Sequence, residues 1–132
     1  MSSSLDKLEM NNLPSKDALR LCRETEDIKT ILVLTTHVDP IVRKRALKEI
    51  CPCRVKEDID VFWERVMEMI DDPADNVREQ VLHTLCDGSP DHMEWKVVDA
   101  LEKFNRDSNQ YIRRRAHKVL SAYRRSGKWN VL

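Results

Sequence analysis

The sequence predicts an all-α protein, a right-handed α-solenoid of about three helical hairpins preceded by a capping helix. Similar segments recur every 35 residues, at 42–50, 77–85 and 112–120, and a period of about 20 to 50 residues is typical of stacked repeats. Within each segment the apolar residues follow a helical spacing. The 132 residues include only 2 Gly and 5% aromatics, with no alternating apolar run, so strands are not expected.

Residues 1–24 are predicted to be an N-terminal segment that contains the capping helix. Pro14-Ser15 precedes an amphipathic stretch from Lys16 to Arg23, and Leu19 and Cys22 are its apolar residues. We expect them to cover the apolar end of the first hairpin, because the terminal unit of a solenoid needs a polar outer face.

Residues 25–132 are predicted to form three repeats, at 25–58, 59–93 and 94–126, followed by a C-terminal tail. Each repeat starts with a helix whose apolar residues are spaced by three. These residues are Ile28, Ile31 and Leu34, then Trp63, Val66 and Met69, then Val98, Leu101 and Phe104. Thr25, Asp58 with Asp60, and Ser89-Pro90 are the expected start signals, and Asp87-Gly88 is an expected stop.

A short polar turn leads to the second helix of each repeat. The expected core residues of these helices are Val42, Ala46 and Ile50, then Val77, Val81 and Leu85, then Ile112, Ala116 and Leu120. Arg43, Arg78 and Arg113 directly follow the first core residue in each case. A planar guanidinium with five donors suits the turn beside it, so we interpret these arginines as structural rather than anion-binding.

The turn and its arginine resemble the HEAT-repeat family, in which an Asp of the turn lies six positions before the Arg. Asp72 with Arg78 and Asp107 with Arg113 have this spacing, whereas the first repeat has His37 in place of the Asp. The resemblance extends from about Thr25 to Arg125. It implies an armadillo-like solenoid whose second helices line a concave surface.

On that interpretation, the outward positions of the second helices form the candidate binding surface for a protein partner of unknown identity. These positions are Lys44, Arg45, Lys48, Glu79, Gln80, His83, Arg114, Arg115 and Lys118. The expected function is a non-catalytic scaffold or adaptor.

Nucleic-acid binding is the alternative function, because charge is unevenly distributed along a chain of zero net charge. Residues 54–105 carry six basic and fourteen acidic residues, whereas residues 106–128 carry eight basic and one acidic. The basic candidates are Arg113, Arg114, Arg115, Lys118, Arg124 and Arg125. Few aromatics are present to stack on bases, and a simply solvated last helix explains the charge equally well. A third interpretation, a HEAT-like enzyme or lyase subunit, depends on fold analogy alone.

Catalysis, cofactors and bound metal are not expected. The four histidines lie in different segments, and none is arranged with an acid and a nucleophile. Cys51-Pro52-Cys53, with His37 or His83 as helpers, is the best metal candidate. Its ligand spacing is shorter than that of structural zinc sites, and Cys51 and Cys86 occupy equivalent small apolar positions.

The segment from Gly127 to Leu132 follows the last helix and contains Trp129. We expect it to fold back over the open end of the last repeat. The alternative is that Trp129 and Leu132 dock onto a partner or a second copy.

The expected location is intracellular and reducing, namely the cytoplasm. The sequence has no apolar run of about 18 residues and no export signal. Its four cysteines are therefore expected to be reduced.

Overall fold

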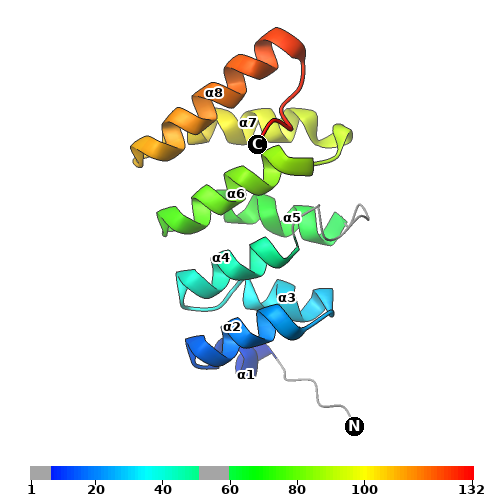
Figure 1. Ribbon diagram of the computed structural model, residues 1–132, viewed down its shortest axis with the longest axis vertical. Helices are drawn as coiled ribbons and strands as arrows, with labels where there is room; N and C mark the ends of the chain where they lie inside the picture. Colours follow the sequence, from blue (N-terminus) through cyan, green and yellow to red (C-terminus); the bar gives the residue numbers. More distant parts are fainter. Residues whose placement is uncertain (1–6, 51–59) are drawn as a thin grey trace. The chain divides into compact units, whose positions relative to one another are not determined.

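The computed structural model describes residues 7–50 and 60–132, and within these ranges every regular element is a helix (Figure 1). The prediction of an all-α protein is therefore confirmed. The chain divides into two compact units, Met1–Ile50 and Cys51–Leu132. No helix in the described ranges is both long enough and apolar enough to cross a bilayer.

The first unit contains α1 (Lys7–Asn11), α2 (Ser15–Glu24), α3 (Ile28–Leu34) and α4 (Pro40–Glu49). Helix α2 packs against α4, and α3 packs against α1, α2 and α4. The predicted helix at 16–23 is thus present as α2, where Cys22 is buried but Leu19 only half-buried. Helix α1 was not predicted, although its Met10 also enters the core.

The starts of α3 and α4 are set by aspartates. Asp27 accepts a hydrogen bond from the backbone N–H of Lys29, and Asp39 accepts one from that of Ile41. Both side chains satisfy backbone donors that the first helical turn leaves free. The start signal predicted at Thr25 is wrong by two residues, because Thr25 ends α2 and accepts from the N–H of Asp27.

The second unit contains α5 (Asp60–Glu68), α6 (Asp75–Gly88), α7 (Glu94–Phe104) and α8 (Gln110–Ser126). Two single turns of 3₁₀ helix, η1 (Met69–Asp71) and η2 (Asp91–Met93), extend α5 and introduce α7. Helix α6 contacts α5, η1, α7 and α8, and α7 packs against α8. In Figure 1, α6 and α8 form one layer of this unit and α5 and α7 lie behind them.

The core of the second unit follows the predicted apolar pattern. All three predicted core residues of α6 and of α8 are fully or almost fully buried. Trp63, Val66, Met69, Leu101 and Phe104 are also buried, as expected for first helices. Helix α6 ends at Gly88, where the sequence predicted its stop. The next residue, Ser89, is the C-cap, and its hydroxyl donates to the Leu85 carbonyl.

The C-terminal tail folds back onto the end of α6. Gly127 has a φ of 73°, a left-handed conformation that ends α8, and its N–H donates to the Tyr123 carbonyl. Trp129 is 5% exposed, and its indole N–H donates to the Ser89 hydroxyl at 2.6 Å. The N–H of Leu132 donates to the Cys86 carbonyl. The tail therefore folds back within its own unit, as predicted, but these contacts are with the end of α6, in the second predicted repeat, instead of the open end of the last one.

Candidate functional site

Arginines at equivalent positions bind the backbone of the turn that precedes their helix. Arg43 Nη1 donates to the carbonyls of His37 (2.8 Å) and Val38 (2.9 Å). Arg78 Nη1 does the same with Asp72 (2.9 Å) and Pro73 (3.2 Å). Arg113 Nη1 repeats the arrangement with Asp107 (2.7 Å) and Ser108 (3.1 Å). The interpretation of these arginines as structural is therefore confirmed at the level of their hydrogen bonds.

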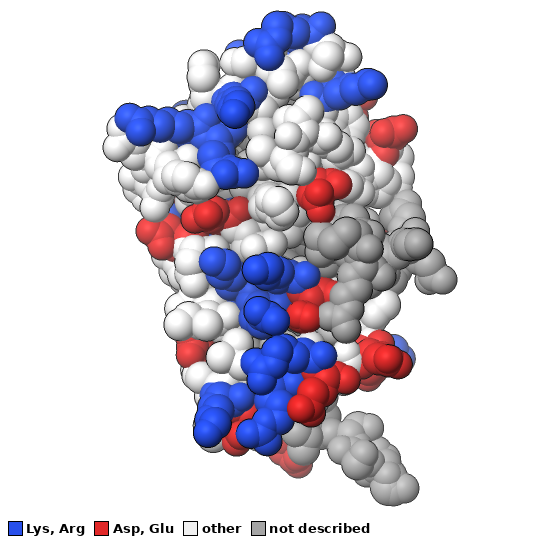
Figure 2. Space-filling model, in the orientation of Figure 1, with Lys and Arg blue, Asp and Glu red and all other residues white. Residues whose placement is uncertain are grey.

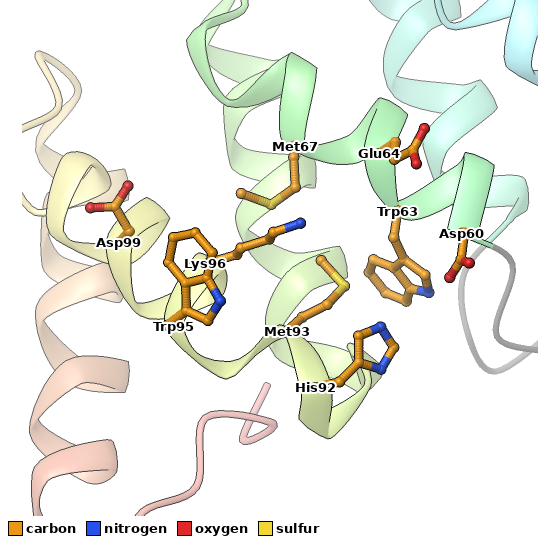
Figure 3. A pocket seen from close by; sticks show the side chains of 9 residues that line it. All are labelled: Asp60, Trp63, Glu64, Met67, His92, Met93, Trp95, Lys96 and Asp99. Carbon is orange, nitrogen blue, oxygen red and sulfur yellow. The ribbon is translucent and has the colours of Figure 1, made fainter.

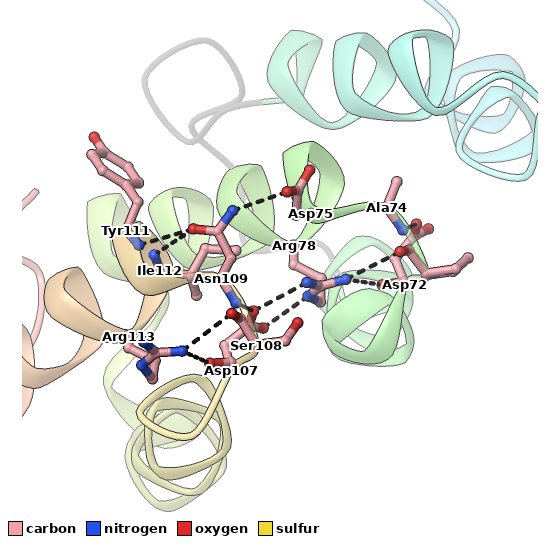
Figure 4. Close-up of polar contacts among 11 residues, drawn as sticks. Asp72, Ala74, Asp75, Arg78, Asp107, Ser108, Asn109, Tyr111, Ile112 and Arg113 are labelled. Atoms are coloured by element: carbon pink, nitrogen blue, oxygen red, sulfur yellow. Dashed lines mark hydrogen bonds and ion pairs between the residues drawn. The ribbon is translucent and has the colours of Figure 1, made fainter.

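Arg78 also reaches the next turn along the chain (Figure 4). Its Nε and Nη2 donate to the two carboxylate oxygens of Asp107 at 2.8 and 3.0 Å, and the Asp107 side chain is only 7% exposed. Burial raises the pKa of Asp107, but hydrogen bonds from Arg78 and from the N–H of Asn109 outweigh it and leave the pKa below its ordinary value. The hydrogen bond to Asp107 correspondingly raises the pKa of Arg78.

In the first turn, His37 accepts the backbone hydrogen bond that an Asp accepts in the other two turns. Asp72 Oδ1 accepts from the N–H of Ala74 at 2.9 Å, and Asp107 Oδ1 accepts from that of Asn109 at 2.8 Å. In the first turn, His37 Nδ1 accepts from the N–H of Asp39 at 3.0 Å. Its Nε2 lies 2.8 Å from the Leu13 carbonyl, which can only accept, so Nε2 is the donor in this contact. His37 thus preserves the hydrogen bond of the turn at the position where the other two turns have Asp.

The candidate residues of α4 lie on the surface of the first unit. Lys48 is exposed, and Lys44 and Arg45 are half-buried. Arg45 Nε lies 3.5 Å from a Glu49 carboxylate oxygen. The structure therefore places all three cations at or near the surface of one helix.

A second row of cations, not predicted from the sequence, lies on the neighbouring helix α2. Lys16, Arg20 and Arg23 are exposed on α2, and their spacing of four and three residues puts them on one stripe. Because α2 packs against α4, the two rows form one surface, which we name the α2/α4 basic face. Figure 2 shows Lys and Arg gathered over these helices. The spacing was visible in the sequence, but α2 was interpreted there only as a cap.

The candidate residues of α6 are less accessible than predicted. Glu79 and His83 are half-buried. Gln80 is 8% exposed, and its amide lies 3.3 Å from the Thr84 hydroxyl, to which it donates. The prediction of Gln80 as an outward residue is wrong. Helix α6 contacts α5, η1, α7 and α8, so it is buried on more sides than a helix with one core face and one solvent face.

The cations of α8 differ in exposure and in whether they bind other groups of the chain. Arg114, Lys118 and Arg125 are exposed. Arg115 donates to the Tyr111 hydroxyl and lies 5.3 Å from the ring centroid, a cation–π contact. Arg124 pairs with Glu102 at 3.3 Å. Together with Arg113, half of the six nucleic-acid candidates already have intramolecular partners.

Metal-ligand chemistry has no candidate in the described part of the chain. No group of three or more His, Cys, Asp or Glu there could hold an ion. Cys51-Pro52-Cys53 lies outside the described residues. Cys22 and Cys86 are buried free thiols, and burial raises their pKa to about 11 and about 12, respectively.

A further feature that the sequence did not predict is a hollow of about 580 Å³ on the α5 and α7 side of the second unit (Figure 3). Trp63 and Met93 form its buried base, and Trp95 stands at one side. Asp60 and Glu64 come from α5, and Lys96 and Asp99 come from α7. The Trp95 side chain is 70% exposed.

No protein-family model, curated protein or solved structure matches this chain. Its function is therefore inferred from its own surfaces.

Proposed function

We propose that this chain is a HEAT-like α-solenoid and acts as a non-catalytic scaffold that binds an acidic segment of a protein partner. The repeat assignment is supported by the turns. Three arginines spaced by 35 residues make the same pair of hydrogen bonds to backbone carbonyls. Such recurrence at the atomic level is what repeated units of one design produce.

The α2/α4 basic face is the observation that carries the functional proposal. It presents six cations on two packed helices (Lys16, Arg20, Arg23, Lys44, Arg45 and Lys48). Within the described ranges, Arg45 is the one member that has an ion pair. The same helices also carry Asp17, Glu24 and Glu49, so the six cations outnumber the carboxylates and leave a net positive charge. Such an excess of charge attracts a partner of the opposite sign and raises its association rate.

An acidic protein segment fits this chain better than nucleic acid does. Of the basic residues on α8, Arg113, Arg115 and Arg124 bind groups of the chain itself. Tyr111, an exposed aromatic of α8, already has the Arg115 guanidinium 5.3 Å from its ring centroid, so a base that stacks there competes with a group of the chain itself. Nucleic acid binding is accordingly the alternative outcome of the test.

The test measures binding of a blocked Glu/Ser-alternating peptide to the wild type and to the double variant K44E/K48E. Each contact between exposed charges contributes up to about 1 kcal/mol, so reversing two cations is expected to weaken binding by about tenfold. The double variant K7E/K29E reverses two exposed lysines of α1 and α3 and is the matched control. Equal weakening in both variants would contradict the assignment to the α2/α4 basic face.

A short DNA duplex is measured in parallel. Tighter binding of the duplex than of the peptide at the same salt concentration, lost in R114E/K118E, would replace the protein partner with nucleic acid. In that case the affinity should also fall steeply as salt is added, because phosphate contacts release counterions.

A further inference from the structure

We propose that the hollow beside Trp95 binds a peptide segment through its lysine or arginine side chains. This site lies on α5, η2 and α7, the first-helix side of the second unit. It is thus distinct from the α2/α4 basic face, and it takes a ligand of the opposite charge. The scaffold would then contact basic as well as acidic segments.

The base and one side of the hollow suit the stem of a long side chain. Trp63 and Met93 are buried beneath it, and Met67 is half-buried beside them. The Trp95 indole is 70% exposed, which leaves a large aromatic face in contact with water. Lysine and arginine cover apolar surface with their methylene groups while the charged end remains polar.

The rim supplies negative charge. Asp60, Glu64 and Asp99 are exposed carboxylates on its border, and Lys96 is the one Lys or Arg among the residues that line it. The rim therefore carries two more negative than positive charges. A cationic side chain is the ligand that this charge favours.

Lys96 shows that an ammonium group is accommodated beside Trp95. Its Nζ lies 5.9 Å from the centroid of the Trp95 ring, and the side chain extends across the hollow (Figure 3). This distance is within the range of a cation–π interaction. Lys96 is exposed, so a ligand cation can displace it at small cost.

A second hollow that shares Trp95 with the first favours a peptide with more than one basic residue. It has a volume of about 560 Å³ and is also bordered by His92 and Asp99. Asp91 and Glu102 are among its other carboxylates, and Glu102 already pairs with Arg124. Trp95 thus borders two hollows with carboxylates, and each can take one cationic side chain.

The experiment uses the full chain and a blocked peptide with two arginines separated by glycine and serine. The three tryptophan indole N–H signals are followed by NMR during titration. We expect the Trp95 signal to shift most and the Trp63 signal to shift with it. Trp129 should not move, because it is buried at Ser89. A peptide with glutamine in place of arginine should shift none of them.

Variants locate the site. W95A should weaken binding about fivefold or more, since it removes the cation–π contact, and its exposure means that folding is retained. E64Q/D99N removes two carboxylates of the rim and should also weaken binding of the arginine peptide. The effect should be largest at low salt, where charges are screened least. D71N removes a charge from η1, outside the hollow, and should bind like the wild type.

Three outcomes would overturn the proposal. The first is equal binding of the glutamine peptide, and the second is unchanged affinity in W95A. The third is self-association in sedimentation experiments that W95A abolishes without peptide, which would assign the hollow to a second copy of the chain.

Discussion

Arg78 makes four hydrogen bonds with one side chain: two to backbone carbonyls of its own turn and two to the Asp107 carboxylate. Only a planar group with donors on several edges can satisfy both partners together. Because the Asp107 carboxylate is almost inaccessible, its charge depends on Arg78 for compensation. This pair therefore links the two turns of the second unit.

The Asp107 pair should make stability depend on acidity. The pKa of Asp107 in the folded state lies below its ordinary value of 3.8. The stabilisation is complete above that ordinary value and is lost as the pH falls through the lower folded value. Urea unfolding of the wild type between neutral and strongly acidic pH should show this loss, and D107N should show a smaller one. An identical pH profile in D107N would contradict this.

Urea unfolding at neutral pH also tests the geometry of the Arg78–Asp107 pair. R78A leaves Asp107 buried without its partner, so we expect the free energy of unfolding to fall by about 3 kcal/mol. R78K keeps the charge but not the fork, and the loss should be smaller than in R78A. R114A, on an exposed residue of α8, is the control and should change stability little.

At the scale of elements, the tail of residues 127–132 behaves as part of the packing of α6. It adds an aromatic side chain, a hydrogen bond to Ser89 and a backbone hydrogen bond to Cys86. Tyr123 of α8 meets the Trp129 ring edge-on at 6.2 Å between centroids. The tail therefore connects the ends of α6 and α8.

Removing the Trp129 ring should destabilise the second unit. W129A loses the burial of a large aromatic, for which we expect about 3 kcal/mol in urea unfolding. S89A keeps the ring but leaves its N–H without an acceptor, at a cost of about 1 to 2 kcal/mol. W95A, an exposed tryptophan of α7, should cost much less than W129A. Equal costs for the two tryptophans would show that the tail is not docked in solution.

The sequence predicted the helices well because their signals are local. Apolar spacing located α2 to α8, and Gly127 marked the end of the last helix. The burial of Gln80 was not predictable, because it depends on which neighbours surround α6. The hollow was not predictable either, since Asp60 and Asp99 are far apart in sequence and come together only through packing. The candidate cations of α4 were predicted individually, but their continuation on α2 required the contact between the helices.

At the scale of the whole molecule, each of the two compact units contains one described, buried cysteine. The reactivity of Cys22 therefore reports on local opening of the first unit, and the reactivity of Cys86 on that of the second. Their raised pKa values, about 11 and about 12, mean that neither is a thiolate in the folded protein at neutral pH. Alkylation of either thiol therefore requires local opening.

Labelling with iodoacetamide, followed by mass spectrometry of peptides, should give slow modification at Cys22 and at Cys86. R78A should accelerate the reaction of Cys86, because the weakened pair lies in the same unit. The R114A protein is the control and should react like the wild type. Fast labelling of Cys86 in the native wild type would contradict the burial of this thiol.

The hydrogen bonds of Arg43, Arg78 and Arg113 to carbonyl oxygens have a consequence for how such turns can diverge. Every amino acid has a backbone carbonyl, so these hydrogen bonds from the arginine do not require particular side chains at the two residues that accept them. At the second of these residues the three turns have Val38, Pro73 and Ser108, yet the arginine binds all three turns alike. The side chain at the second of these residues can therefore change without altering the geometry of the hairpin, provided that the arginine is kept.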